Sequence, residues 1–578
     1  MSQDRRTDRR SDASYWDRYT RARISRRTLL HGAATTAVAA GAIAIAGCSS
    51  SDSGAKSSGS PAVAATPPVQ PEIVNGGGTP RRGGRFATAN SATFGTFDPH
   101  LGIQVASAYF PRIYNVLLNQ SATRPEWLFM DLAQSYETPD DTTYIFKIRP
   151  GVRIAPNDLG VPERDLDAED VRVTLERIRT DSATTQYSFG KQHISSVSVS
   201  GDTVTVKTPE PYAWFLNRIG LFLNCIAPRE LLAGDLSRLA SKAAGAGPYR
   251  LVELTEGEHA RFDANPNYYR TDEARGNTRL PYVDGLDVKV IYDRVTQRTA
   301  FQSGQIHMYW AAGLADAQGL GSGNAITNEP GFAYISMTMN PRRPPFDDPR
   351  VRRAISRAIN RQEYVDRVYK GDARGDGVIA WSLGAYALGA DELDRTYQPF
   401  NLDEAKQLVR QVGGIRLKMM YPAGTTIQEH GAHLPIFLGQ MASAGIQVDQ
   451  DPQSFAVWIG NYHEMNYDCS LALNQLYETP ELPLLMHTKG GPFGDNSYIQ
   501  GLGEPDIEAA VKKANTQLDV QARIQAVHDA QKVIYDKDPI MLPLVTPIDH
   551  YVYPAGVRNI TTGIGTSNYL LNDFWLDG

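Results

Sequence analysis

The chain has 578 residues, of which 42% are hydrophobic and 21% are charged, and its formal charge is −6. This apolar content supports a buried core, and the length predicts two or three structural domains. The acidic balance argues against a nucleic-acid partner, because a phosphate backbone requires a basic face.

Residues 1–47 have the features of an export signal. Arg26 and Arg27 precede a weakly apolar run over 29–46, which is too short and too diluted by polar residues for a membrane span. "SRRTLL" resembles the twin-arginine export motif, and "IAGC" resembles the lipobox that ends in a lipidated cysteine, here Cys48. The resemblance implies export followed by lipid anchoring on the outer face of the cytoplasmic membrane. The alternative to a targeting segment is that these residues form an ordinary N-terminal helix.

The segment 48–82 is dominated by Ser, Gly, Ala and Pro. Such a composition cannot bury enough apolar area to offset its conformational entropy, so we expect a flexible tether. Removal of residues 1–47, which hold nine Lys or Arg and four Asp or Glu, leaves 49 basic and 60 acidic residues and a formal charge of −11.

Strand and helix patterns alternate after the tether. Residues 142–152 and 201–211 alternate in polarity as strands do, and 167–179 has helical spacing with Asp167 as its N-cap. A third strand is predicted within 280–293, with one face formed by Leu286, Val288, Val290 and Tyr292. This alternation indicates an α/β chain.

The clearest helix start lies at Asp348, which can cap a helix whose first residue is Pro349. The apolar face of this helix would consist of Val351, Ala354, Ile355, Ala358 and Ile359, and Gly371 would end the segment. Five arginines share the region, at positions 350, 352, 353, 357 and 361. We interpret them as a solvated face rather than as a phosphate site.

Five segments resemble, in order, the family 5 extracellular solute-binding proteins, which are the oligopeptide, dipeptide and nickel-chelate receptors of ABC importers. They are "GGRFATANSATFGTFDPH", "YETPDDTTYIFKIRPGVR", "GAGPYRLVELTEGEHARFDANPNYYR", "AFQSGQIHMYW" and "FDDPRVRRAISRAINRQEYVDRVYKGDARGDGVIAW". In the fourth, Gln305 and His307 replace two acids that are usual in the family.

The resemblance implies a two-lobed periplasmic-binding-protein fold of class II, with mixed sheets, flanking helices and a hinge of two crossing segments. Lobe I would comprise 83–310, with a subdomain near 121–204, and lobe II would comprise 311–539. The C-terminal 540–578 would return to lobe I. Hinge closure would then trap a solute between the lobes.

Ligand recognition departs from the pattern of peptide-binding relatives. These relatives hold the ligand's ammonium group with an aspartate, and Leu476 or Tyr477 occupies that place here, with Glu478 as the nearest acid. Trp381, Trp458 and Tyr477 could stack on a ligand, although a core position is favoured for each taken singly. The candidate ligand-binding residues are Gln104, Ser107, Trp381, Ser382, Trp458, Tyr477 and Glu478.

Catalytic and metal signals are weak. Ser188 and Lys191 form a Ser-x-x-Lys pair in what reads as a polar loop, and no further element of a penicillin-binding enzyme accompanies them. His430 and His433 are spaced for one helix face but make an incomplete metal site, so surface histidines are favoured. We therefore expect no catalytic residue, no metal and no cofactor.

The two thiols of the globular part, Cys225 and Cys469, lie in apolar stretches. Buried free thiols are favoured over a disulfide between them.

The sequence thus predicts a monomeric lipoprotein that captures a peptide or similar-sized solute and delivers it to a membrane ABC permease. Within the same fold, an oligosaccharide or a metal chelate is the alternative ligand. From other classes, a secreted hydrolase and a passive adhesin remain as alternatives.

Overall fold

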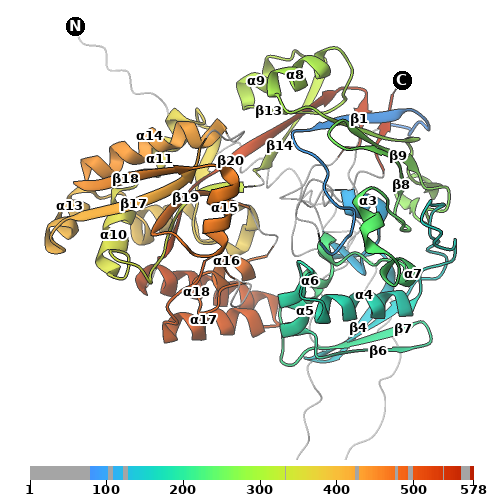
Figure 1. Ribbon diagram of the computed structural model, residues 1–578, viewed down its shortest axis with the longest axis horizontal. Helices are drawn as coiled ribbons and strands as arrows, with labels where there is room; N and C mark the ends of the chain where they lie inside the picture. Colours follow the sequence, from blue (N-terminus) through green and yellow to red (C-terminus); the bar gives the residue numbers. More distant parts are fainter. Residues whose placement is uncertain are drawn as a thin grey trace, which may run out of the picture. The chain divides into compact units, whose positions relative to one another are not determined.

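A computed structural model describes residues 78–101, 109–120, 128–331, 333–423, 428–475, 479–492, 497, 499–537, 539–560 and 573–577 (Figure 1). The chain divides into two units, Met1–Pro61 and Ala62–Gly578, and every described residue belongs to the second unit. Arg26, Arg27 and Cys48 lie outside the described residues. Within the described ranges, no helix is both long enough and apolar enough to cross a membrane.

A four-stranded sheet contains the first strand of the described chain, in the order β1, β12, β9, β8. Its strands are β1 (Arg85–Asn90), β8 (Tyr249–Thr255), β9 (His259–Ala264) and β12 (Gly285–Val290). Leu286 and Val288, which were predicted to share one face, are both buried in β12. The prediction for Tyr292 is wrong, because β12 ends at Val290 and the Tyr292 side chain is 56% exposed. The chain has already turned there toward α8 (Arg294–Gln302), which begins after its N-cap Asp293.

A second four-stranded sheet, in the order β4, β5, β7, β6, packs against α4. Its elements are β4 (Ala133–Asp140), β5 (Thr143–Ile148), α4 (Ala168–Thr180), β6 (Ser196–Ser200) and β7 (Thr203–Lys207). The predicted strands and helix are confirmed. So is the N-cap, because the Asp167 side chain accepts hydrogen bonds from the backbone N–H groups of Glu169 and Asp170.

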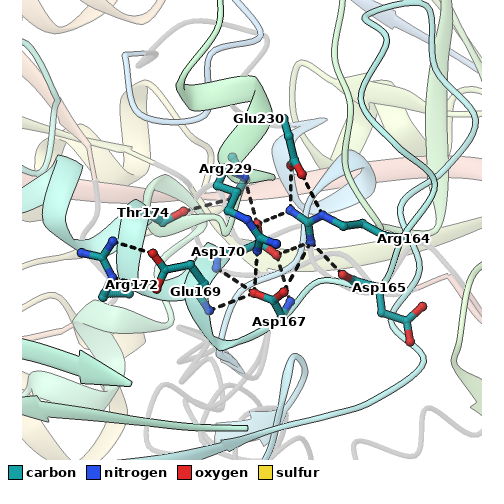
Figure 2. Close-up of polar contacts among 10 residues, drawn as sticks. Arg164, Asp165, Asp167, Glu169, Asp170, Arg172, Thr174, Arg229 and Glu230 are labelled. Atoms are coloured by element: carbon teal, nitrogen blue, oxygen red, sulfur yellow. Dashed lines mark hydrogen bonds and ion pairs between the residues drawn. The ribbon is translucent and has the colours of Figure 1, made fainter. Parts of the chain in front are cut away.

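Figure 2 shows the ionic network at the start of α4. The Asp170 carboxylate is fully buried, and its Oδ1 lies 2.6 Å from Arg164 and 3.3 Å from Arg229. Arg164 also forms an ion pair with Glu230 at 2.7 Å. Because Arg229 and Glu230 belong to α7 (Arg229–Leu232), the network joins two helices that are distant in sequence.

The largest sheet in the described part of the chain has eight strands, ordered β13, β20, β15, β19, β17, β18, with β14 and β16 also paired to β20. Its strands are β13 (Tyr309–Ala311), β14 (Asn324–Pro330), β15 (Ala333–Met339), β16 (Ala373–Gly375), β17 (Ile415–Pro422), β18 (Ile446–Gln453), β19 (Cys469–Gln475) and β20 (Met541–Pro554). β15 is buried on both faces, with Ile335 and Met337 in one hydrophobic cluster and Tyr334 in another. This burial explains its nearly continuous apolar sequence.

The strand β20 links two groups of strands. Its first half pairs with β15 and β16, and its second half pairs with β14 and β13. The consecutive strands β14 and β15 connect the same two groups of strands a second time. The backbone N–H of Gly331, between these strands, donates to the carbonyl of Pro547 in β20 at 2.8 Å. Two hydrogen-bonded crossing segments therefore connect the lobes of the predicted class II fold.

The helix predicted from Asp348 is two helices, α10 (Pro349–Ala358) and α11 (Arg361–Arg367). Asp348 caps α10 as predicted, but Ile359 and Asn360 are extended. The Asn360 N–H donates to the side chain of Gln440, which in turn donates to the Asn360 carbonyl. A side chain from elsewhere in the chain thus satisfies the backbone groups that a helix break leaves unpaired.

The predicted solvated arginine face is wrong for three of its five members. Arg352 is 2% exposed and donates to the Phe346 carbonyl, and Arg361 is 5% exposed and donates to the Pro543 carbonyl. Arg357 is largely buried beside Glu404. The free-energy cost of burying these guanidinium groups is offset by carbonyl and carboxylate partners from other parts of the chain.

The remaining elements surround these sheets. They include α3 (Phe110–Ile113), α5 (Tyr187–His193), α6 (Phe215–Ile219), α9 (Leu314–Gln318), η5 (Trp381–Tyr386), α12 (Ala390–Glu392), α13 (Leu402–Gln411), α14 (Gln428–Ser443), α15 (Phe455–His463), α16 (Glu481–Leu485), α17 (Pro505–Thr516) and α18 (Val520–Lys537). Six short strands form two-stranded sheets. β2 (Leu118–Gln120) pairs with β3 (Leu128–Met130), β10 (Thr271–Asp272) pairs with β11 (Thr278–Arg279), and β21 (Val557–Arg558) pairs with β22 (Trp575–Leu576). Ser188 lies in the first turn of α5 and not in a loop, which corrects the reading of that segment.

Candidate functional site

The loop after β16 is tied to the hinge strand β20 by one carboxylate. Asp376 is 1% exposed and accepts hydrogen bonds from the backbone N–H groups of Gly377 at 2.9 Å and Trp381 at 3.0 Å. Its other oxygen accepts from the hydroxyl of Thr546 in β20. Burial raises the pKa of Asp376 to about 6, although hydrogen bonds from these groups oppose the shift. The start of η5 is therefore positioned directly by the crossing strand.

Two predicted ligand-binding residues, Trp381 and Ser382, begin η5. The guanidinium of Arg374 lies 4.9 Å from the centre of the Trp381 ring, in cation–π geometry. Arg374 itself belongs to β16 and pairs with Thr546 of β20. The Ser382 Oγ is buried and has no hydrogen-bond partner among the described residues. The structure thus brings the Arg374 guanidinium and the Trp381 indole together beside β20.

Trp458 occupies a different setting. It is 4% exposed on α15, its Nε1 donates to the Ser470 hydroxyl at 3.0 Å, and its ring stacks on Tyr462 at 5.1 Å. The Tyr462 hydroxyl lies 3.2 Å from that of Thr338 and 3.3 Å from the Asn474 side chain. Trp458 therefore packs in a buried layer with polar neighbours, which is the core position that the sequence favoured for it.

Four other predicted ligand-binding residues, Gln104, Ser107, Tyr477 and Glu478, lie outside the described residues. The strand that leads to two of them is described: Gln475, the last residue of β19, pairs with Ala333 beside the first crossing segment. The strand β19 therefore ends beside the first crossing segment.

His433 is not a surface residue; it is fully buried, with ring centroids 5.5 Å from Tyr364 and 5.4 Å from Tyr369. The side chain of His430 lies outside the described residues. Among the described residues, no group of three or more acidic, histidine or cysteine side chains is arranged to hold a metal ion.

Cys225 and Cys469 are both free and fully buried. Burial raises the pKa of each thiol well above its usual value. Both are therefore packed as thiols of low reactivity.

A sequence model of the bacterial extracellular solute-binding proteins, family 5 (middle region), matches residues 128–494 of this chain. The chain belongs to this family. The matched region includes β15, the Asp376 loop and α15, whereas β20 with Thr546 lies beyond it.

Relatives of this family 5 protein match over most of its length. Di/tripeptide-binding protein 2 of Pseudomonas aeruginosa is 23% identical over 473 residues, which cover 74% of this chain and 82% of that protein. The glutathione-binding protein GsiB of Salmonella paratyphi A is 23% identical over 498 residues, which cover 79% of this chain and 88% of that protein. The periplasmic binding protein DppA from Helicobacter pylori, solved with the peptide STSA, is 20% identical with a TM-score of 0.72, covering 86% of this chain and 99% of that chain.

Sequence reasoning missed Arg374 and Asp376 in this family 5 protein. Both stand in "GDARGDGVIAW", just before Trp381. The available signal was an arginine and two aspartates in an otherwise small and apolar segment that leads to a tryptophan. Thr546, which contacts Asp376, lies 170 residues away from it, so the pattern alone could not pair them.

A second set of contacts was also missed, between the segment 212–218 and the helices α16 to α18. The Ala213 N–H donates to the Asn515 carbonyl at 2.7 Å, and the Ala213 carbonyl accepts from Arg523 at 3.1 Å. The indole of Trp214 donates to the Asn515 side chain at 2.9 Å. The Tyr212 hydroxyl donates to the buried Glu481. These contacts join residues about 270 to 310 positions apart in the chain.

Proposed function

We propose that this family 5 protein is the substrate-binding lipoprotein of an ABC importer, and that it captures a peptide or similar-sized solute between its lobes. The family match over 128–494 carries the proposal. It is supported by relatives that are named for di- and tripeptides and for glutathione. The solute would then pass to a membrane permease, and the protein would act as a monomer without a cofactor.

The proposed lobes are 83–310 and 311–539, with 540–578 returning to the first. The two crossing segments would act as the hinge, because only two backbone strands must bend for the lobes to move. A solute that contacts both lobes only after closure would shift the equilibrium toward the closed state. We propose Trp381 and Ser382 for such a contact, and the tie of their loop to β20 through Asp376 supports this choice.

Binding specificity can be tested by calorimetry with free peptides, N-acetylated peptides, oligosaccharides and metal chelates. We expect peptides to bind and the Glu478→Gln variant to change their affinity little, because Glu478 precedes Thr479-Pro480, a turn that would direct its side chain to solvent. A loss of roughly 1.5 to 3 kcal/mol in that variant, matched by N-acetylation of the peptide, would instead assign the ligand ammonium to Glu478. Exclusive binding of an oligosaccharide or a chelate would contradict the peptide proposal.

The same samples test the absence of covalent chemistry. Mass spectrometry should recover every bound peptide intact after prolonged incubation. Cleaved peptides would favour the secreted-hydrolase alternative.

Export and anchoring form a separate test. Replacement of Arg26 and Arg27 by Lys should block export, because the twin-arginine pair is what the export machinery reads. Cys48→Ala should release the protein from membranes, as measured by fractionation. Undiminished membrane attachment of the Cys48→Ala protein would exclude the lipobox assignment.

A further inference from the structure

Glu481, the first residue of α16, is a buried carboxylate with few hydrogen bonds. Its side chain accepts from the Tyr212 hydroxyl through one oxygen, and the other oxygen has no hydrogen-bond partner among the described residues. Arg218 forms an ion pair with it, but the Nε of Arg218 lies 3.8 Å from this second oxygen, beyond hydrogen-bond distance. A buried carboxylate needs several donors to keep its charge at low cost, so the charge of Glu481 is poorly stabilised here.

The surroundings of Glu481 come from the opposite proposed lobe. Tyr212 precedes α6 and Arg218 lies within it, in the proposed lobe I, whereas α16 belongs to the proposed lobe II. One hydrophobic cluster contains residues of both sides, including Phe215 of α6 and Val511 of α17. The contact between the two lobes therefore buries Glu481, and separation of the lobes would return its carboxylate to water.

The other ionisable groups near this contact do not depend on closure in the same way. His193 of α5 stacks on the Tyr212 ring at 3.9 Å, and burial together with the charge of Arg218 lowers its pKa to about 4. Because His193, Tyr212 and Arg218 all belong to lobe I, their mutual contacts persist when the lobes separate. The charged groups of α17 and α18 nearby have other partners: Asp506 pairs with Lys537, Lys512 with Glu210, Glu508 with the Lys489 backbone, and Arg523 with Ala213 and Trp214.

The direction of the proton linkage follows from this burial. Burial raises the pKa of Glu481, although the charge of Arg218 and the hydrogen bond from Tyr212 oppose the shift. In the open form the solvated carboxyl group should titrate near its ordinary value of 4.5. Closure therefore takes up a proton at pH values between the ordinary and the raised pKa. The closed form gains stability as the pH falls through this window, and the charged carboxylate favours opening above it.

We propose that the contact of Glu481 with Tyr212 and Arg218 is a latch between the lobes, and that protonation of Glu481 favours its closure. This inference rests on the proposed function, because it requires lobes that open and close, but it is independent of the chemistry of the solute. One proton per closure changes the closure equilibrium at most tenfold per pH unit. Acid would therefore strengthen retention of a solute, and a rise in pH would promote its release.

The test is small-angle scattering of the purified full-length chain, free of ligand, between pH 8 and pH 5. The radius of gyration of the wild-type chain should fall as the pH falls. Glu481→Gln, which is uncharged at every pH, should stay compact over the whole range. Tyr212→Phe should move the midpoint of the transition to higher pH, because the charged carboxylate loses its hydrogen-bond donor. A purely structural role of Tyr212 would leave this midpoint unchanged.

Glu210→Gln is the matched control for the loss of an acid at this contact. Glu210 pairs with Lys512 at 3.1 Å between the same two proposed lobes, but both side chains are more than half exposed. An exposed carboxylate loses little solvation on closure, so this variant should keep the wild-type pH profile. Circular dichroism at each pH and thermal unfolding of each variant report whether the chain remains folded.

A radius of gyration that is independent of pH in the ligand-free wild-type chain, but falls with a saturating random tripeptide mixture, would overturn the latch and leave the proposed function intact. The same pH transition in Glu481→Gln as in the wild-type chain would also overturn the latch. Compaction with neither acid nor tripeptides would overturn the latch together with the hinge closure of the proposed function.

Discussion

At His100, burial and a neighbouring guanidinium determine the protonation state of the imidazole. Nδ1 lies 3.1 Å from Arg177, which can only donate, so Nδ1 accepts and the protonated Nε2 donates to the Cys225 carbonyl at 2.9 Å. Arg177 also forms an ion pair with the buried Asp98 at 2.8 Å. Burial and the charge of Arg177 lower the pKa of His100 to about 4, against an opposing effect of Asp98.

This lowered pKa predicts an acid-sensitive stability. The unfolded chain takes up a proton at His100 near pH 6.5, whereas the folded chain does so only near pH 4. The free energy of unfolding should therefore fall as the pH falls through this window, by about 1.4 kcal/mol per pH unit for each such group. His100→Asn should remove one such contribution from the slope, measured by urea unfolding between pH 7 and pH 4.5.

Nuclear magnetic resonance of labelled histidine provides the check on the native state. The His100 imidazole should remain neutral until well below pH 5. Protonation of His100 in the folded chain near pH 6.5 would contradict this explanation, whatever the unfolding slope.

At the scale of elements, the Gly-Ala-Gly-Pro-Tyr motif allows β8 to start against α3. A Cβ at Gly245 would lie 2.2 Å from the Ile113 carbonyl oxygen, and one at Gly247 would lie 2.7 Å from that of Arg112. Both obstacles are backbone atoms, which cannot rotate away. The backbone N–H of Gly247 also donates to the Ile113 carbonyl at 2.9 Å. The two glycines of the motif thus allow the backbone before β8 to lie directly against the backbone of α3.

Gly245→Ala should destabilise the protein by about 1 to 3 kcal/mol, because the added methyl group forces the two segments apart. Gly389→Ala is the matched control, since a Cβ there meets nothing within 4 Å. The midpoints of urea unfolding should differ between the two variants. Equal midpoints would show that β8 and α3 can separate without cost.

At the scale of the molecule, the contacts of Ala213 and Trp214 with Asn515 and Arg523 join the proposed lobe I to helices of the proposed lobe II. The guanidinium of Arg523 lies 4.8 Å from the centre of the Trp214 ring. If hinge motion separates the lobes, these contacts exist only in the closed state. They would then stabilise closure independently of the solute.

Small-angle scattering should show a smaller radius of gyration at saturating ligand, because closure removes the space between the lobes from solvent. Asn515→Ala removes the hydrogen bond from Trp214 and should lower ligand affinity about 3- to 10-fold, the worth of one neutral hydrogen bond. The thermal stability of the free protein should change little. An unchanged radius of gyration at saturating ligand would argue against closure.

The sequence by itself determined the local elements, because their causes are local. Asp167 and Asp348 cap helices through backbone N–H groups two or three residues away. In the strand at 286–290, successive side chains point to opposite faces, so the alternation of polarity is visible in the sequence. The order of five motifs was enough to indicate the family and its two crossing segments.

Only the tertiary structure decided which polar groups are buried and what they contact. Arg361 donates to a carbonyl 182 residues away, and Asp376 accepts from Thr546 at a separation of 170 residues. Sequence periodicity carries no information about such distant pairs. The arginine face was therefore wrongly predicted as solvated, and the sequence offered no reason to single out Arg374. Burial of a charge depends on partners that arrive from other elements, and these are brought together only when the sheets and helices pack.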